Sequence, residues 1–393
     1  MKVRYVTLEA IFMGVSSLLG IYSQIYSDGT TIKLYSLVFG VLAIFLYSYS
    51  RKKNKPFHIW LGVMLYMVLV GYMSASAWPE HTYTFIRLDL ASIVYISMGL
   101  IFADRQFDNY REKVFLIITM CALAAGLSSI VQVIKGGVSL VDRYVTIQEN
   151  NSGYVLWGVV CNVFAYAGYS AIFNKKWRSL KTAVVVLYGI LGLYFQKRSI
   201  IVNIVVMCAI GFFVYSKEHN GKRKLLRGTA AICAILIAFA LLLRYSPNIR
   251  NLLDSTLLRM TSSRLTDYDR SREATQFLEK SGFWRTLIGY GIGNYYIDGY
   301  GLRHGMLHIG YYNIIYKGGI VYAGFWCYIA SKTIKTIRKI RKLDAYALSC
   351  LCITISAFVS MVFEFSWGET ILPFCYMPFI GYICMLSDKG IDQ

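Results

Sequence analysis

Arginine dominates a long polar segment between Arg244 and Arg303. The segment has eight arginines and a single lysine, Lys280, whereas the basic stretches elsewhere favour lysine. A planar guanidinium can hold two phosphate oxygens at once, which an ammonium group cannot do. The arginine bias therefore predicts an anionic ligand. Aspartates and glutamates in the same segment leave ordinary surface ion pairs as the alternative explanation for most of these arginines.

His308 is the candidate general base. It precedes an apolar run that continues to Ala330, so it would lie at the amino-terminal end of a membrane helix. The positive end of the helix dipole disfavours protonation there and keeps the imidazole neutral, as a general base requires. A role in capping the helix or anchoring it at the interface is the alternative. His304, four residues earlier, is a competing base.

Two further cations stand in unusual places. Arg198 lies between two apolar stretches at the predicted outer surface, where a guanidinium is costly unless an anion pairs with it. Snorkelling to the lipid head groups is the alternative. Lys317 lies nine residues into the apolar run after His308, so we expect it to face the bundle interior and to pair with Glu364 or Glu369.

Two motifs connect these residues. TDYDRSREATQFLEK at 266–280 predicts a short helix that begins near Asp269, with Phe277 and Leu278 dipping into the bilayer and Arg272 facing solvent or a cavity. LIGYGIGNYY at 287–296 has three alternating glycines, which permit a tight turn and a close approach of the backbone to a ligand. A pattern of this kind is more often only a turn.

The elements that must position these residues are membrane helices. Of 393 residues, 56% are hydrophobic and only 5 are proline, which is more apolar surface than a soluble protein of this length can bury. Runs of about 20 apolar residues match the thickness of a bilayer. We predict one all-α integral membrane domain, 1–393, with an extracytoplasmic loop at 244–307 before the tenth span. The twelve predicted spans are 7–26, 34–49, 57–78, 88–102, 114–134, 154–173, 182–195, 200–215, 228–243, 308–330, 345–363 and 370–386.

Alternate loops are basic, which predicts their side of the membrane. The basic stretches at 51–55, 174–181, 331–342 and after Lys217 belong inside, so both termini are expected in the cytoplasm. The net charge of +20 then reflects topology and attraction to anionic lipid, and nucleic-acid binding is not expected. The nine cysteines fall mostly within predicted spans without metal-ligand spacing, so we expect neither a metal site nor a cofactor.

The order of these features resembles the O-antigen polymerase and O-antigen ligase superfamily of bacterial surface polysaccharide assembly. The resemblance covers about residues 195–325: KRSIIVNIV at 197–205, the SRE segment, LIGYGIGNYY, and His308 followed by GGI. It implies an inverting, metal-independent membrane glycosyltransferase with a GT-C-like fold. Two positions depart from the family, because Ile309 stands where Asn is frequent and Lys317 where an acidic residue is frequent.

The resemblance also implies roles for single residues. Arg198 and Arg272 would contact the lipid diphosphate, and His308 would activate the acceptor. Weaker candidates for binding the substrate are Arg264, Arg270, Arg303, His304 and Tyr311.

The implied donor is an undecaprenyl diphosphate-linked oligosaccharide at the outer face of the bacterial cytoplasmic membrane. We prefer a polymerase that links repeat units into O-antigen, capsule or exopolysaccharide, with the flippase and chain-length regulator of the pathway as partners. A ligase that transfers finished glycan to a lipid A core or other acceptor is the first alternative. A lipid-linked oligosaccharide flippase or transporter is the second, although the paired repeats usual in transporters are not evident.

Overall fold

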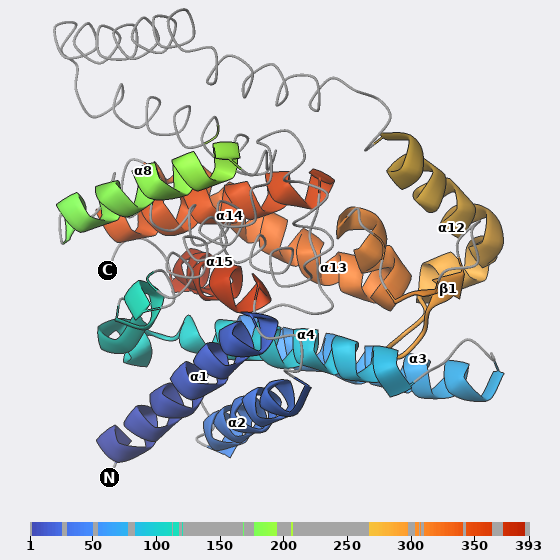
Figure 1. Cartoon of the computed structure of the whole chain (residues 1–393), viewed down its shortest axis with the longest axis horizontal. Coiled ribbons are helices and arrows are strands. Elements are labelled where there is room, and N and C mark those ends of the chain that lie inside the picture. Colours follow the sequence, from blue (N-terminus) through green and yellow to red (C-terminus); the bar gives the residue numbers. More distant parts are fainter. Residues whose placement is uncertain are drawn as a thin grey trace, which may run out of the picture.

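The protein is described from a computed structural model and is mostly helical (Figure 1). The structure describes residues 2–25, 30–49, 54–77, 83–111, 113–117, 120, 168, 177–194, 206, 267–297, 303–305, 307, 310–340, 343–363 and 372–389. The helices are α1 (Lys2–Ile25), α2 (Thr30–Tyr49), α3 (Lys55–Ala77), α4 (Tyr83–Phe102), the short η1 (Arg105–Phe107), α8 (Arg178–Tyr194), α12 (Asp267–Ile288), α13 (Gly310–Arg338), α14 (Ala345–Phe363) and α15 (Leu372–Lys389).

Each predicted span that the structure describes over most of its length is a helix. The boundaries at 49, 102 and 363 coincide with the ends of α2, α4 and α14. The predicted spans at 114–134, 154–173, 200–215 and 228–243 lie largely or wholly outside the described residues. The total of twelve spans and the GT-C-like fold therefore stay predictions.

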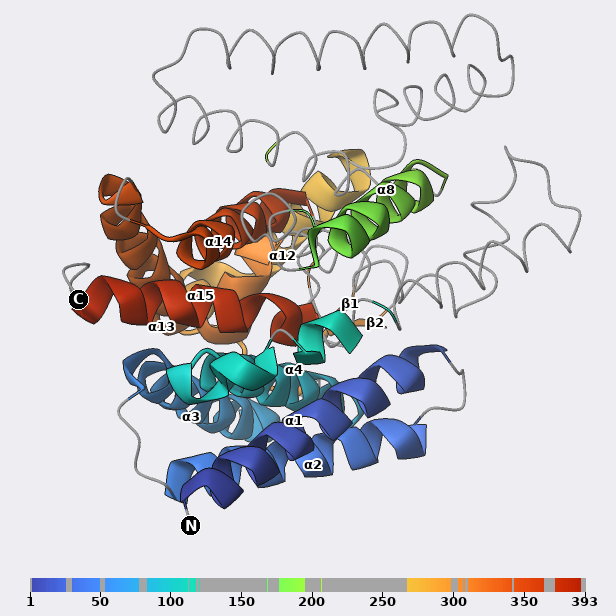
Figure 2. The ribbon, with the colours of Figure 1, turned by 90° about the vertical axis from the view of Figure 1, so that its left-hand side faces the viewer.

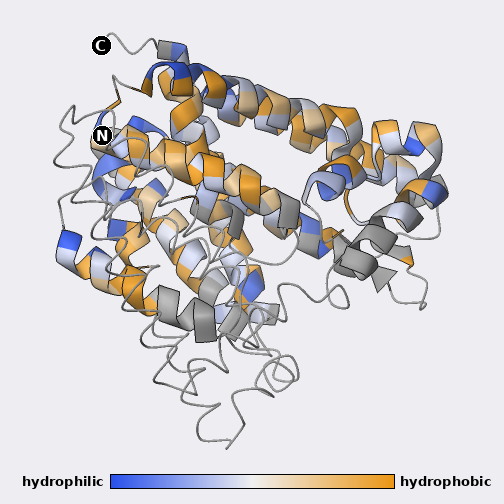
Figure 3. Ribbon diagram, turned by 90° about the horizontal axis from the view of Figure 1, so that it is seen from above, coloured by the Kyte–Doolittle hydropathy of each residue, from blue (hydrophilic) through white to orange (hydrophobic). Residues whose placement is uncertain are grey.

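Several of these helices have the length and composition of membrane spans. Among the described residues, Thr31–Tyr49 and Lys55–Ser74 are long and apolar enough to cross a bilayer, and a bent pair at 89–102 and 105–117 would make a third span. Shorter apolar helices cover 5–20 and 345–359. Apolar residues predominate along the bundle helices (Figure 3). These are the features of an α-helical membrane protein.

Large apolar side chains also remain on the outside of the bundle. Ile11 on α1, Phe45 on α2 and Leu65 on α3 are 52%, 67% and 57% exposed. A surface of this kind is unfavourable in water but suits contact with lipid. Between α1 and α2, by contrast, the Ser36 hydroxyl donates to the Ser16 carbonyl at 2.6 Å, the small-residue packing common between membrane helices.

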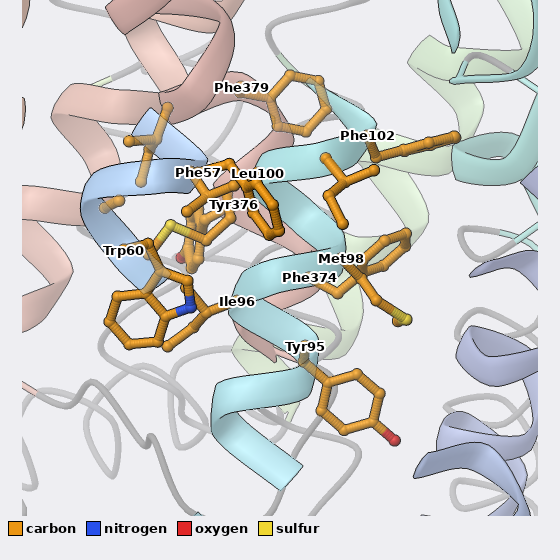
Figure 4. Packing of buried hydrophobic residues seen from close by; sticks show 14 of the residues in the cluster. Phe57, Trp60, Tyr95, Ile96, Met98, Leu100, Phe102, Phe374, Tyr376 and Phe379 are labelled. Carbon is orange, nitrogen blue, oxygen red and sulfur yellow. The ribbon is translucent and has the colours of Figure 1, made fainter. Parts of the chain in front are cut away.

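The bundle has three layers, with α4 near its centre. Figure 2 shows α1 and α2 side by side, then α3 and α4, then α13, α14 and α15. The residues of α4 from Ala91 to Phe102 are all buried, as expected for a helix surrounded by others. Phe102 stacks on Phe374 of α15 with ring centroids 5.7 Å apart. Trp60 of α3 lies beside Ile96 of α4 (Figure 4).

The two ends of the bundle differ. α1 begins and α15 ends at one end, whereas α12 and the strands lie at the opposite end (Figure 1). The strands β1 (Tyr296–Ile297) and β2 (Arg303–His304) form a short antiparallel pair with Tyr296 opposite His304. From there α13 runs back toward the end that holds both termini, where the Lys332 ammonium pairs with Asp388 of α15.

Candidate active site

The segment that leads into the candidate site is α12. It begins at Asp267, close to the predicted start, and it is interrupted at Gly282, where φ is +64°. The sequence predicts that Phe277 and Leu278 enter the bilayer. Phe277 instead packs within the protein, 2% exposed and edge-on to the Tyr316 ring at 5.4 Å, while Leu278 is 44% exposed. A hydrophobic cluster of Phe277, Tyr290, Leu307 and Tyr316 therefore holds α12 against α13.

The glycine motif after α12 is bound to the start of α13 through its backbone. The N–H of Tyr290 donates to the Tyr316 carbonyl at 2.7 Å, and the N–H of Gly291 donates to the Lys317 carbonyl at 2.9 Å. Gly319, with φ of +53°, interrupts the helix just after these carbonyls, where residues four positions later would otherwise donate to them. The two residues just before the GGI motif thus supply acceptors for the LIGYGIGNYY motif.

The same loop is also bound to α3. The N–H of Ile292 donates to the Met67 carbonyl at 3.2 Å, and the Tyr66 hydroxyl donates to the Ile288 carbonyl at 2.8 Å. A Cβ on Gly71 would lie 2.6 Å from the Ile292 carbonyl oxygen, so the two backbones meet without space for a side chain. The glycines of this motif therefore allow close approach to protein backbone.

A buried ion pair completes the attachment. The Lys317 Nζ lies 2.7 Å from the Asp89 Oδ2, and the two side chains are 8% and 11% exposed. The same carboxylate oxygen accepts from the Gly293 N–H at 2.8 Å, and the Lys317 Nζ also lies 3.4 Å from the Asn294 carbonyl oxygen. One pair therefore connects α4, α13 and the glycine loop.

This geometry confirms the interior position of Lys317 but not the expected partner. Lys317 pairs with Asp89, whereas Glu364 and Glu369 lie outside the described residues. Asp89 is the second residue of a predicted span, and an acidic residue inside an apolar span is itself a signal of an internal partner. The position of Asp89 in an apolar span could therefore have identified it as the partner of Lys317.

A cavity of about 20 Å³ lies beside the ion pair, with room for a water molecule. Asp89, Lys317, Ser92 and Tyr322 contribute its polar lining, and Trp60 contributes part of its apolar wall. The Ser92 hydroxyl is buried and has no hydrogen-bond partner among the described residues. A water in this cavity would satisfy that hydroxyl beside the carboxylate.

The described site candidates lie on three elements at one end of the bundle. Arg270 and Arg272 belong to α12, and Arg303 and His304 form β2. Tyr311, in the first turn of α13, is 41% exposed, and its hydroxyl donates to the Phe358 carbonyl at 2.8 Å. Arg198, Arg264 and His308 lie outside the described residues, so the convergence of Arg198, Arg272 and His308 stays a prediction.

Arg285 was not singled out in the sequence, and the structure gives it a packing role. Its guanidinium lies over the Tyr290 ring, 3.8 Å from the centroid, a cation–π contact that helps hold the end of α12 on the glycine loop. At least this arginine of the segment at 244–303 therefore contacts protein. Within the described part of the chain, His, Cys, Asp and Glu side chains form no cluster of three or more that could hold a metal ion.

No protein-family model matches the sequence, and no curated protein matches it. Functional assignment therefore depends on the motifs and on the geometry that joins them.

Proposed function

We propose that the protein is a membrane glycosyltransferase that polymerises undecaprenyl diphosphate-linked oligosaccharide repeat units into O-antigen, capsule or exopolysaccharide. It would act at the outer face of the bacterial cytoplasmic membrane, as a multi-pass protein of twelve spans with both termini in the cytoplasm. The observation that supports this most is the direct contact between the two glycine motifs of the resemblance, 287–296 and 318–320. Residues 297–317 separate them in the chain, and their backbones meet.

The junction of these motifs is suited to positioning substrate groups. α12, which carries Arg270 and Arg272, and β2, which carries Arg303 and His304, both connect to a loop held by backbone hydrogen bonds and by the Lys317–Asp89 pair. Functional groups placed on rigid elements keep the geometry that a reaction needs. The arrangement of the bundle, with α12 opposite the start of α1 and the end of α15, also supports a loop on the other side of the membrane from the termini.

The proposed reaction is a single inverting displacement. The acceptor hydroxyl oxygen attacks the anomeric carbon of the donor sugar, the bond from that carbon to the phosphate oxygen breaks, and the lipid diphosphate leaves with the bonding electrons. His308 takes the proton of the acceptor hydroxyl. Arg272 and Arg198 stabilise the negative charge that develops on the leaving phosphate.

The test is transfer by purified protein in nanodiscs, with a lipid diphosphate-linked oligosaccharide as the sole substrate and the products separated by size. We expect a ladder spaced by whole repeat units. His308→Ala is expected to lower the rate about 10²–10⁴-fold and Arg272→Ala about 10²–10³-fold. Arg338→Ala is the matched control, because Arg338 is an exposed arginine at the opposite end of the bundle, and its rate should stay at the parental value.

Other outcomes would replace this assignment. Transfer only after addition of a lipid A core or another acceptor would indicate the ligase. No transfer to any acceptor would favour the flippase. Ladders that persist in His308→Ala would remove His308 from the role of base.

A further inference from the structure

A second cavity lies at the opposite end of the bundle from α12. It has a volume of about 370 Å³ and is formed by the start of α3, the turn after α4 and the end of α15. Figure 1 shows these elements at the end of the bundle where α1 begins and α15 ends. This volume falls within the roughly 300–1,000 Å³ typical of small-molecule sites.

Two exposed cations line this cavity, and one of them, Arg105, also interacts electrostatically with Asp108, which itself pairs with Arg111 at 3.1 Å. Lys55, the first residue of α3, and Arg105 of η1 are both exposed, and neither side chain makes an ion pair or hydrogen bond among the described residues. The two carboxylates of the lining already have donors. Asp104 accepts from the Tyr47 hydroxyl at 2.9 Å, and Asp388 pairs with Lys332.

Local structure fixes the backbone positions of both cations. The Asn54 side-chain oxygen accepts from the Phe57 N–H at 3.1 Å and caps α3, while its amide nitrogen donates to the Leu100 carbonyl at 2.9 Å. The cap therefore ties Lys55 to the end of α4. On the other side, Arg111 is 2% exposed and donates to the Phe102 and Asp104 carbonyls, both at 2.9 Å. These bonds hold the sharp turn that carries Arg105.

The sign and the position of this charge favour a phosphate group. The charged residues of the lining are Lys55, Arg105, Asp104 and Asp388. Asp388 is paired with Lys332 beside the cavity, so two cations and one carboxylate of the lining are left without an ion-pair partner in the part of the chain that the structure describes. Lys335, Arg338 and Lys339, at and just after the end of α13, add further exposed cations to this end of the bundle. Basic pockets between membrane helices on the cytoplasmic side suit lipid head groups. Met385 and Leu386 supply an apolar wall for the adjoining part of a lipid.

We propose that this cavity binds a phosphate-bearing anion, with Lys55 and Arg105 contacting the phosphate oxygens. The source of the phosphate is a phospholipid headgroup or a soluble phosphate ester. The site is independent of the glycosyltransferase proposal, because it uses other residues at the other end of the bundle.

Native mass spectrometry of the detergent-purified full chain tests this proposal. Phosphatidylglycerol is added in one series and glycerol 3-phosphate in another, and the bound fraction is measured. The Lys55→Gln/Arg105→Gln variant is expected to bind about 25-fold more weakly, since each cation near a phosphate contributes roughly five-fold. The control, Lys335→Gln/Arg338→Gln, removes two exposed cations from the same end but outside the cavity, and its binding should be unchanged.

The outcomes distinguish a lipid headgroup from a soluble phosphate ester, and binding in the cavity from general attraction to surface charge. Adducts with phosphatidylglycerol alone assign the cavity to a lipid, and adducts with glycerol 3-phosphate of similar strength assign it to a soluble ester. Equal loss of binding in both double variants overturns the proposal, because general surface charge then explains the attraction. Absence of both adducts from the parental protein also overturns it. Melting temperatures of the variants establish that each is folded.

Discussion

Lys317→Met is expected to lower the free energy of unfolding by about 3–5 kcal/mol, because it leaves the Asp89 carboxylate buried without its cation. The Lys317 Nζ lies 2.7 Å from Asp89 Oδ2, and both side chains are largely buried. Methionine keeps an unbranched apolar side chain of similar length, so the change mainly removes the charge. The measurement is the thermal melting of purified protein in one detergent, with glycan transfer measured alongside.

The matched control is the double variant Asp89→Asn/Lys317→Met. It contains no uncompensated charge, and the asparagine side-chain oxygen can still accept from the Gly293 N–H, which donates to Asp89 in the parental protein. We expect it to recover most of the stability that Lys317→Met loses, as neighbouring residues in one network couple strongly. A double variant that melts as early as Lys317→Met would contradict this explanation.

Hydropathy predicts the helices well because membrane spans must satisfy their backbone hydrogen bonds within one apolar segment. The ends of α2, α4 and α14 agree with the sequence for this reason. The Lys317 pairing was harder to predict, because its partner lies 228 residues earlier in the chain. The cost of a buried ammonium signals that an anion must be near, but hydropathy does not say which helix brings it.

The candidate site, too, could be predicted from the sequence only in part. Helical spacing puts Phe277 and Leu278 next to each other on α12, but only the packing of Tyr316 determines that the first is buried and the second exposed. The glycine motif predicts a turn and a close approach. That the approach is to protein backbone depends on Gly71 of α3 and Gly318 of α13, whose positions no local pattern encodes. The roles of Arg198, Arg272 and His308 remain predictions from the motif order.

Gly291→Ala is expected to detach the glycine loop from α3. The φ of Gly291 is +72°, a conformation that costs other residues roughly 1–2 kcal/mol. Its new Cβ would also overlap the backbone of Gly71 and lie 2.8 Å from the Met67 carbonyl oxygen. Overpacking of this kind adds about 1–3 kcal/mol. Because backbone cannot move aside as a side chain can, the loop and helix must separate.

Gly282→Ala is the control that has the backbone strain without the steric overlap. Gly282 has a similar φ of +64°, but a Cβ there would meet nothing within 4 Å, so only the backbone strain applies. Hydrogen exchange gives the local measurement, since the N–H groups of Tyr290, Gly291 and Ile292 all donate to α13 or α3. We expect these amides to lose protection in Gly291→Ala and to keep it in Gly282→Ala. Equal protection in the two variants would mean that the backbone contact with Gly71 does not hold the loop, and the rigid junction proposed to position the arginines would lose its main support.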